Sequence, residues 1–182
     1  MKIIETDRLI LRKINQNDYK EMKSILQNKD LMIIGWGKTY SDDEVQTWIN
    51  KIMEQYEKYG YSYYIAIAKN NNSIIGIMGI IPVNIKNTDY IEIAYILKQE
   101  YWGNGYATEG INACISYAFS TLNADKIIAQ VIPENKSSIN VLERLGMKLI
   151  DEYIRDYGDK KSLHLIYELT KEQYIKKFCT KP

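Results

Sequence analysis

The sequence predicts one α+β domain, built on a mixed, mostly antiparallel, twisted sheet that is flanked by helices. Its 182 residues, of which 46% are hydrophobic, suffice for one compact core. Apolar residues alternate with a period of two in several short segments and recur at helical spacing in others. These segments alternate between strand and helix before a last hairpin, and no repeat or linker divides them, so residues 1–182 are expected to form a single domain.

The individual elements follow from these two periods and from the residues that interrupt them. The helix after Ser41 has the clearest signal, because Ser41 and Glu44 form a capping-box pair and Gly60 supplies a left-handed end. In chain order we expect a strand at 8–12, a helix at 18–26, a mobile aromatic loop at 31–40, a helix between 41 and 60, strands at 62–68 and 73–81, a polar connection at 82–89, a strand at 90–97, a helix from 108, a strand at 126–132, a helix at 135–145, strands at 147–155 and 162–169, and a short final helix.

Composition and charge exclude several function classes. The 24 Lys and Arg residues nearly balance the 23 Asp and Glu residues, so the basic footprint of a nucleic-acid-binding domain is missing. No apolar run approaches the roughly 18 residues of a membrane span. The two cysteines, Cys114 and Cys179, form no metal-like pair, and no metal site is expected. We therefore expect a reducing, cytoplasmic location, without a nucleic-acid or membrane partner.

The stretch YWGNGYATEG, at residues 101–110, places two glycines one residue apart between an apolar run and a helical one. A strand that ends in glycines before a helix presents free backbone amides at the positive end of the helix dipole, which favours an anion such as a phosphate. A plain tight turn is the alternative. The chain has no G-x-x-x-x-G-K-[ST] string, and a dinucleotide fingerprint would need glycine where Thr108 stands.

WGNGYATEG resembles the phosphate-binding loop of the GNAT superfamily of N-acetyltransferases. The pattern of that loop is Gln/Arg-x-x-Gly-x-Gly/Ala, with Trp102, Gly105 and Ala107 at its three defined positions. Trp102 departs from the pattern at its first position. In having tryptophan there, the loop resembles the subgroup of ribosomal-protein N-terminal-alanine acetyltransferases. The stretches ETDRLILRKINQNDY, GIMGI and VIPENKSSINVLERLGMK resemble the same subgroup in the same order, so that the resemblance covers about residues 6–169.

The resemblance implies that acetyl-CoA is the co-substrate and that no metal takes part. It implies that backbone amides of the loop hold the pyrophosphate, while the pantetheine runs between the splayed strands 90–97 and 126–132. Amides near residues 93–95 would polarise the thioester carbonyl. The cofactor-binding residues carried over in this way are Ile93, Ala94, Tyr95, Ile96, Leu97, Trp102, Gly103, Asn104, Gly105, Tyr106, Ala107, Thr108 and Asn135.

The candidate catalytic residues are Glu92 and Ser138. Glu92 interrupts an otherwise apolar strand that, by the resemblance, points at the cofactor, and would act as general base. In the alternative, Glu92 lies on the solvent face of that strand, since its parity is opposite to that of Ile93. Ser138 resembles the residue proposed in the subgroup to reprotonate the thiolate leaving group. Asn135 and Ser138 are also typical of a helix start, so a capping role is the alternative for both.

Two further polar residues are expected to be ordinary parts of the last strand. His164 is the only histidine and lies far in sequence from Cys114, so no Cys/His nucleophilic pair is expected. Tyr167 alternates with leucines and is expected to be a core aromatic residue rather than a catalytic hydroxyl.

The acceptor is expected to be a primary amine, either a peptide N-terminus or a small amine such as a polyamine, that attacks acetyl-CoA directly in a ternary complex. By the resemblance it enters opposite the cofactor, with Trp36 and Asp89 as candidate substrate-binding residues. A non-catalytic acyl-CoA-binding or sensing module remains an alternative, as does an interaction domain whose glycines only form a turn. The sequence leaves a monomer and a homodimer equally open.

Overall fold

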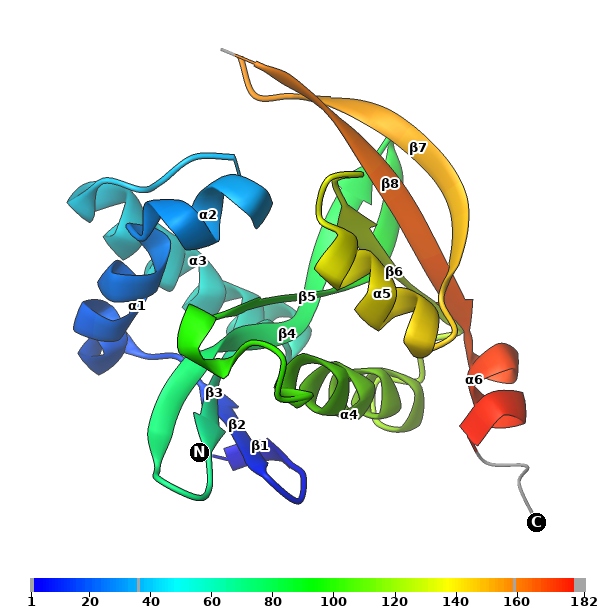
Figure 1. Ribbon diagram of the computed structural model, residues 1–182, viewed down its shortest axis with the longest axis horizontal. Coiled ribbons are helices and arrows are strands. Elements are labelled where there is room, and N and C mark those ends of the chain that lie inside the picture. The colour runs from blue at the N-terminus through cyan, green and yellow to red at the C-terminus, as the bar shows by residue number, and fades with distance from the viewer. Residues whose placement is uncertain (1, 36, 159, 179–182) are drawn as a thin grey trace.

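A twisted sheet runs through the whole molecule in the computed structural model, which describes residues 2–35, 37–158 and 160–178 (Figure 1). The sheet has eight strands in the order β1-β2-β3-β4-β5-β6-β8-β7. Neighbouring strands are antiparallel except for β5 and β6, which are parallel, so the predicted mixed sheet is confirmed. The strands are β1 (Lys2–Glu5), β2 (Leu9–Lys13), β3 (Tyr63–Ala68), β4 (Ser73–Ile85), β5 (Thr88–Leu97), β6 (Lys126–Val131), β7 (Lys148–Asp156) and β8 (Lys161–Thr170).

Helices cover the sheet, and their buried stripes join it in one main hydrophobic core. The α-helices are α1 (Tyr19–Leu26), α2 (Lys29–Gly35), α3 (Asp42–Tyr59), α4 (Tyr106–Ser120), α5 (Lys136–Arg144) and α6 (Lys171–Phe178). Short 3-10 turns, Gln16–Asp18 and Gln99–Tyr101, precede α1 and the glycine stretch. Cys114 and Tyr167 are both buried in the core, as expected. Among the described residues, no helix combines the length and apolar character that a bilayer crossing requires.

The predicted caps of α3 are confirmed. The Glu44 amide donates to the Ser41 hydroxyl at 3.2 Å, and the Ser41 amide donates back to the Glu44 carboxylate at 2.8 Å. Gly60 ends the helix with a φ of 82°, in the left-handed region that glycine adopts without steric cost. These local signals therefore fix both ends of the longest helix.

The aromatic loop expected at residues 31–40 is in part wrong, because α2 occupies its first half. Leu31 and Met32 on this helix are buried in the core. Its N-terminus is capped by Asn28, whose side-chain oxygen accepts from the amides of Asp30 at 3.0 Å and Leu31 at 3.2 Å. The capping residue therefore converts an apolar stretch that reads as a loop into a short helix.

The polar connection expected at residues 82–89 is also wrong, since β4 and β5 continue through it as a hairpin. Residues from Pro82, opposite Ile91, to Ile85, opposite Thr88, are paired across it. The turn is made by Lys86 and Asn87, with φ values of 50° and 63°. Pro82 is tolerated because β3 pairs with β4 only as far as Gly79, so that the other edge of β4 is free there.

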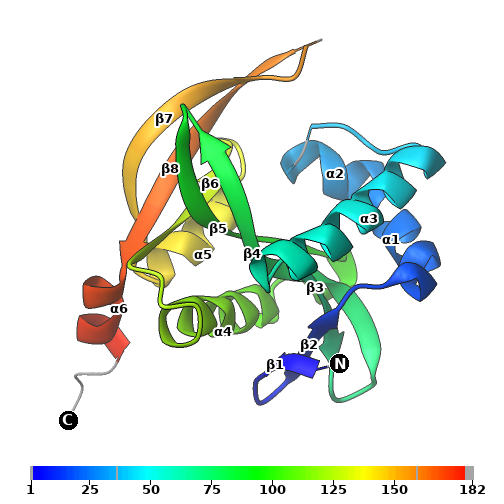
Figure 2. The same ribbon diagram turned by 180° about the vertical axis from the view of Figure 1, so that it is seen from behind.

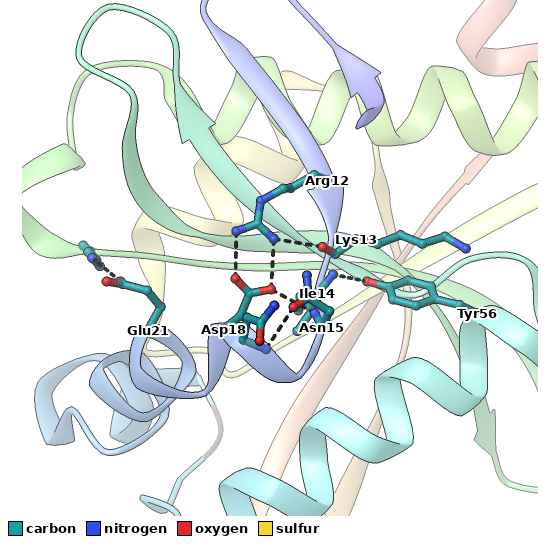
Figure 3. Close-up of polar contacts among 9 residues, drawn as sticks. Arg12, Lys13, Ile14, Asn15, Asp18, Glu21 and Tyr56 are labelled. Atoms are coloured by element: carbon teal, nitrogen blue, oxygen red, sulfur yellow. Dashed lines mark hydrogen bonds and ion pairs between the residues drawn. The ribbon is translucent and has the colours of Figure 1, made fainter. Parts of the chain in front are cut away.

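A partly buried ion pair ties β2 to the start of α1 (Figure 3). The Arg12 guanidinium donates to both carboxylate oxygens of Asp18, at 2.7 and 2.9 Å. Burial alone would raise the pKa of Asp18, but the hydrogen bonds from Arg12 and from the Asn15 amide hold it below its usual range. Beside this pair, the Tyr56 hydroxyl on α3 accepts from the Ile14 amide at 3.0 Å. The contacts fix α1 and α3 against the sheet and so shape the wall of the site described below.

The close approach of β3 and β4 at Gly79 gives a first prediction. A Cβ atom at Gly79 would lie 2.5 Å from the backbone oxygen of Ser62 and 2.6 Å from Tyr63 Cα, and the backbone cannot move away easily. Gly79→Ala should therefore lower the free energy of unfolding by about 1–3 kcal/mol in urea denaturation. Gly35→Ala is the matched control, because its Cβ would meet nothing within 4 Å. Equal stability of both variants would contradict this account of the packing.

Candidate active site

A cavity of about 690 Å³ lies where strands β5 and β6 separate. The two strands share one paired position, Glu92 with Ile128, and no residue of β5 after Glu92 pairs with β6. Figures 1 and 2 show β5 and β6 diverging from one another. The expected splayed strand pair is thus present. The cavity is lined by residues of β4, β5, β6, α3, α5 and the β7–β8 hairpin, including Glu92, Ile93, Ala94, Tyr95, Asn135 and Ser138.

Glu92 lies buried in the cavity wall, with only 7% of its surface exposed. Its carboxylate accepts a hydrogen bond of 2.8 Å from the Gln130 side chain on β6, and Gln130 in turn accepts from the Tyr153 hydroxyl on β7. Burial raises the pKa of Glu92 to about 7, and the Gln130 hydrogen bond and the Arg155 charge limit the rise. The alternative position on a solvent face is wrong. A carboxyl group that is half ionised near neutral pH suits proton transfer.

A pair of hydroxyl groups faces the same cavity across the gap from β5 to α5. Tyr95 Oη lies 3.0 Å from Ser138 Oγ. Asn135 caps α5, because its side-chain oxygen accepts from the Ser138 amide at 3.1 Å, so the structural role expected for Asn135 is present. Burial raises the pKa of Tyr95, and the contact with Ser138 opposes that rise. The sequence predicts Tyr95 only as a cofactor contact and gives no indication of this contact of its hydroxyl group.

The glycine stretch forms an uncapped helix start next to the end of β5. Gly103 and Gly105 have φ values of 75° and 79°, and both are exposed. Gly105 is the N-cap of α4, and within the described part of the chain this helix start has no side-chain cap. The Trp102 indole nitrogen donates to the Leu97 carbonyl at 2.8 Å and ties the loop to β5. Exposed amides at a helix N-terminus, approached without a Cβ atom, fit the pyrophosphate of acetyl-CoA.

The loop is held in place by a network that sequence reasoning missed. Arg8, just before β2, donates to the Asn104 carbonyl at 2.9 Å and pairs with the Glu109 carboxylate at 2.5 Å. The Thr6 hydroxyl donates to the other oxygen of Glu109 at 2.5 Å. The Arg8 guanidinium also lies 4.6 Å from the centre of the Tyr106 ring. These residues belong to the stretches ETDRL and NGYATEG, but nothing in either stretch indicates that they meet.

Neither of the two residues expected to bind the acceptor is seen among the cavity-lining residues. Trp36 lies outside the described residues. Asp89 is exposed and accepts a hydrogen bond of 2.7 Å from Asn84; it is not part of the cavity lining. The part of the cavity lining away from α5 comes instead from α3, the segment before it, the start of β3 and the last hairpin, namely Tyr40, Trp48, Lys51, Tyr63, Tyr153, Arg155, Tyr157 and His164.

Cys114, the one cysteine among the described residues, lacks the surroundings of a nucleophile. His164 is buried on β8, with Nε2 3.1 Å from the Tyr157 hydroxyl, and burial followed by the charges of Arg155 and Lys160 lowers its pKa to about 4. Burial raises the pKa of Cys114 to about 12, so its thiolate is scarce at neutral pH. Among the described residues, no three His, Cys, Asp or Glu side chains gather as metal ligands would.

Comparisons with known proteins agree with this geometry. The profile of the acetyltransferase (GNAT) domain family matches residues 8–148. Uncharacterized protein YkkB of Bacillus subtilis is 33% identical over 142 residues, which cover 78% of this chain and 83% of that protein. The ribosomal protein uS5 alanine N-acetyltransferase of Escherichia coli is 23% identical over 159 residues, covering 85% and 81%. The crystal structure of spermidine N-acetyltransferase from Vibrio cholerae, in complex with CoA and spermine, matches with a TM-score of 0.77 at 21% identity, covering 93% of this chain and 99% of that one. The resemblance found in the sequence is confirmed.

Proposed function

The chain belongs to the GNAT acetyltransferase family, and we propose that it transfers the acetyl group of acetyl-CoA directly to a primary amine in a ternary complex. The observation that carries this proposal is the buried Glu92 carboxyl at the point where β5 and β6 separate. Two relatives are named for amine acceptors, spermidine in one case and an alanine of ribosomal protein uS5 in the other. The same class of acceptor, a peptide α-amine or a small amine, is proposed here.

The glycine loop and the splayed strands provide the features that acetyl-CoA needs. The first-turn amides of α4 would hold the pyrophosphate, and Arg8 would keep the loop in place through its bonds to Asn104 and Glu109. The pantetheine would lie against β5 beyond Glu92, where no residue of β6 pairs with it. Its amide groups would there hydrogen-bond to strand backbone that a closed sheet would use internally.

The proposed step needs one base and one acid. The neutral amine attacks the thioester carbon, and Glu92 takes the proton that the nitrogen loses as the new C–N bond forms. Backbone amides of residues 93–95 stabilise the negative charge that develops on the carbonyl oxygen. The C–S bond then breaks, and the CoA thiolate takes a proton from the pair formed by Ser138 and Tyr95, whose oxygens lie 3.0 Å apart. The pair regains a proton from water and Glu92 releases its proton to water, so both groups return to their starting states.

The proposal is tested by measuring binding and turnover separately. Acetyl-CoA at about one hundred times its dissociation constant should stabilise the protein by about 2.7 kcal/mol in thermal unfolding. Adding a panel of peptide and small amines should then release free CoA thiol and yield the N-acetylated amine in mass spectrometry. Stabilisation without CoA release from any amine would support the non-catalytic module instead. No stabilisation at all would leave the glycines as a structural turn and remove the proposal.

A further inference from the structure

The cavity is lined by more basic than acidic side chains. Its charged lining residues are Lys38, Lys51, Lys86, Glu92 and Arg155. Glu92 is thus the one acid among the described lining residues, and burial raises its pKa to about 7, so that it carries only part of a negative charge at neutral pH. A polyamine, whose charges are all positive, would meet net repulsion in such a cavity. The lining therefore disfavours an acceptor of high positive charge.

Two of the four basic residues already have acidic partners. Lys38 Nζ lies 2.5 Å from the Glu44 carboxylate, and Lys86 Nζ lies 2.8 Å from that of Asp151. Within the described part of the chain, neither Lys51 nor Arg155 forms an ion pair with an acid. A positive charge that lines a substrate cavity without a counter-ion is free to bind an anionic group of the ligand.

Arg155 is placed on the cavity side of β7 by strand alternation. Tyr153 and Arg155 on β7 and Tyr157 directly after it line the cavity, whereas Ile154 does not. Arg155 is also exposed, so that its charge lies at the open side of the cavity. The Arg155 guanidinium lies 5.1 Å from the centre of the Tyr157 ring, and the Tyr157 hydroxyl contacts His164 at 3.1 Å. The arginine is therefore supported by the aromatic wall of the hairpin.

The charge of Arg155 affects the pKa of the candidate base, Glu92. After burial and the Gln130 hydrogen bond, the charge of Arg155 is the next influence on the pKa of Glu92, which it lowers. It also lowers the pKa of His164, where burial is the larger cause. The same cavity thus holds a carboxyl group able to accept a proton from an amine and, within electrostatic range of it, a guanidinium group that contacts the aromatic hairpin residues but forms no ion pair with a described acid.

We propose that the acceptor amine also carries a carboxylate, as an amino acid does, and that Arg155 binds this carboxylate while the amine lies next to Glu92. The inference rests on the proposed acetyl transfer and narrows its acceptor. A guanidinium group matches a carboxylate with two parallel hydrogen bonds, which fixes orientation as well as charge. Lys51 on α3 adds to the attraction, and the tyrosine-rich walls accommodate the carbon skeleton of the acceptor.

The test uses acceptors that differ only in the carboxylate. CoA release by the full-length protein is measured with L-phenylalanine, L-leucine and L-alanine, each against its primary amide, and with spermidine. At a given pH, a larger fraction of the amine is unprotonated in the amide form than in the carboxylate form. Intrinsic reactivity therefore favours the amide, and a preference for the carboxylate must come from the protein. The variants are Arg155→Gln, which removes the charge, Arg155→Lys, which keeps it, and Lys148→Gln as the control on the same strand but outside the cavity lining.

The wild type should favour at least one carboxylate over its amide by roughly 10- to 100-fold in kcat/KM, mainly through a lower KM. Arg155→Gln should bring that ratio close to one, Arg155→Lys should keep part of it, and Lys148→Gln should keep all of it. Acetyl-CoA should still raise the unfolding temperature of each variant, which shows that it is folded. Preference for the amides or spermidine, turnover of no member of any pair, or an unchanged ratio in Arg155→Gln would overturn the inference. Turnover of amines without a carboxylate would meanwhile leave the proposed function intact.

Discussion

Glu92→Gln should lower kcat by about 10²- to 10⁴-fold and leave the affinity for acetyl-CoA unchanged. The amide keeps the size of the side chain and can still bond to Gln130, but it cannot take a proton from the attacking amine. Steady-state CoA release gives kcat, and thermal unfolding with acetyl-CoA reports on binding. The control is Glu54→Gln. It removes an exposed carboxylate of α3 that does not line the cavity. Unchanged turnover in Glu92→Gln would exclude this residue as the base.

The same substitution has a signature in its pH dependence. Because the base must be ionised, kcat/KM of the wild type should rise with pH through about 7, the value to which burial raises the pKa of Glu92. Deprotonation of the acceptor amine adds a rise at higher pH, but the component near pH 7 should be absent from the residual activity of Glu92→Gln. A base elsewhere in the cavity would leave the profile of the variant with the same rise.

At alkaline pH, Glu92→Gln should raise the free energy of unfolding, although it lowers activity. The pKa of Glu92 is about 7 in the folded protein against 4.5 in the unfolded chain, so the folded state holds the proton more tightly. Folding stability is therefore lost as the pH rises from about 4.5 to 7, and above that the burial of the ionised group costs about 3 kcal/mol. At pH 8, Glu92→Gln should unfold at a higher denaturant concentration than the wild type. A less stable variant would mean that Glu92 is not buried as an ionised group.

Glu92 also shows where strand alternation stops being informative. Its parity on β5 is opposite to that of Ile93, which suggested that one of the two faces solvent. In the structure both are buried, with exposed fractions of 7% and 2%, because β5 lies inside the sheet and is covered on both faces. Alternation separates the two faces of a strand, but only packing decides whether either face meets water.

The acceptor side shows a second limit of the sequence. In the sequence, Tyr153, Arg155 and Tyr157 alternate with Ile154 and Asp156 at the end of a late strand and look like the solvent side of an edge hairpin. They line the same cavity as Glu92 only because β8 pairs with β6, and β7 pairs with β8. The contact of Arg8 with Glu109, 101 positions apart, is of the same kind. Caps, turns and the glycine loop are local signals and could be predicted, whereas contacts between distant strands could not.

The glycine loop is the local signal with the largest consequence. Gly105→Asp should abolish the stabilisation by acetyl-CoA, which for the wild type at one hundred times its dissociation constant corresponds to a rise of roughly 5–10 °C in unfolding temperature. The new carboxylate would lie at the N-cap of α4, where it repels the pyrophosphate and itself bonds to the first-turn amides.

The variant should remain folded, which makes the loss of binding interpretable. Asp tolerates a φ of 79° better than most residues do, and its Cβ would lie 3.4 Å from the Arg8 guanidinium, an ordinary contact. Gly158→Asp is the control, because Gly158 also has a left-handed backbone conformation, with a φ of 89°, and open space around it. It should keep the full rise in unfolding temperature.

Gly105→Asn separates charge from shape, because Asn is isosteric with Asp and adopts left-handed angles as readily. If repulsion of the pyrophosphate is the cause, Asn should retain part of the stabilisation that Asp removes, and added salt should narrow the difference between the two variants. Equal loss in both would show that the backbone must approach the phosphate without any Cβ atom. Full retention in Gly105→Asp would mean that the pyrophosphate binds away from α4, and the two glycines would then serve only to turn the chain from β5 into that helix.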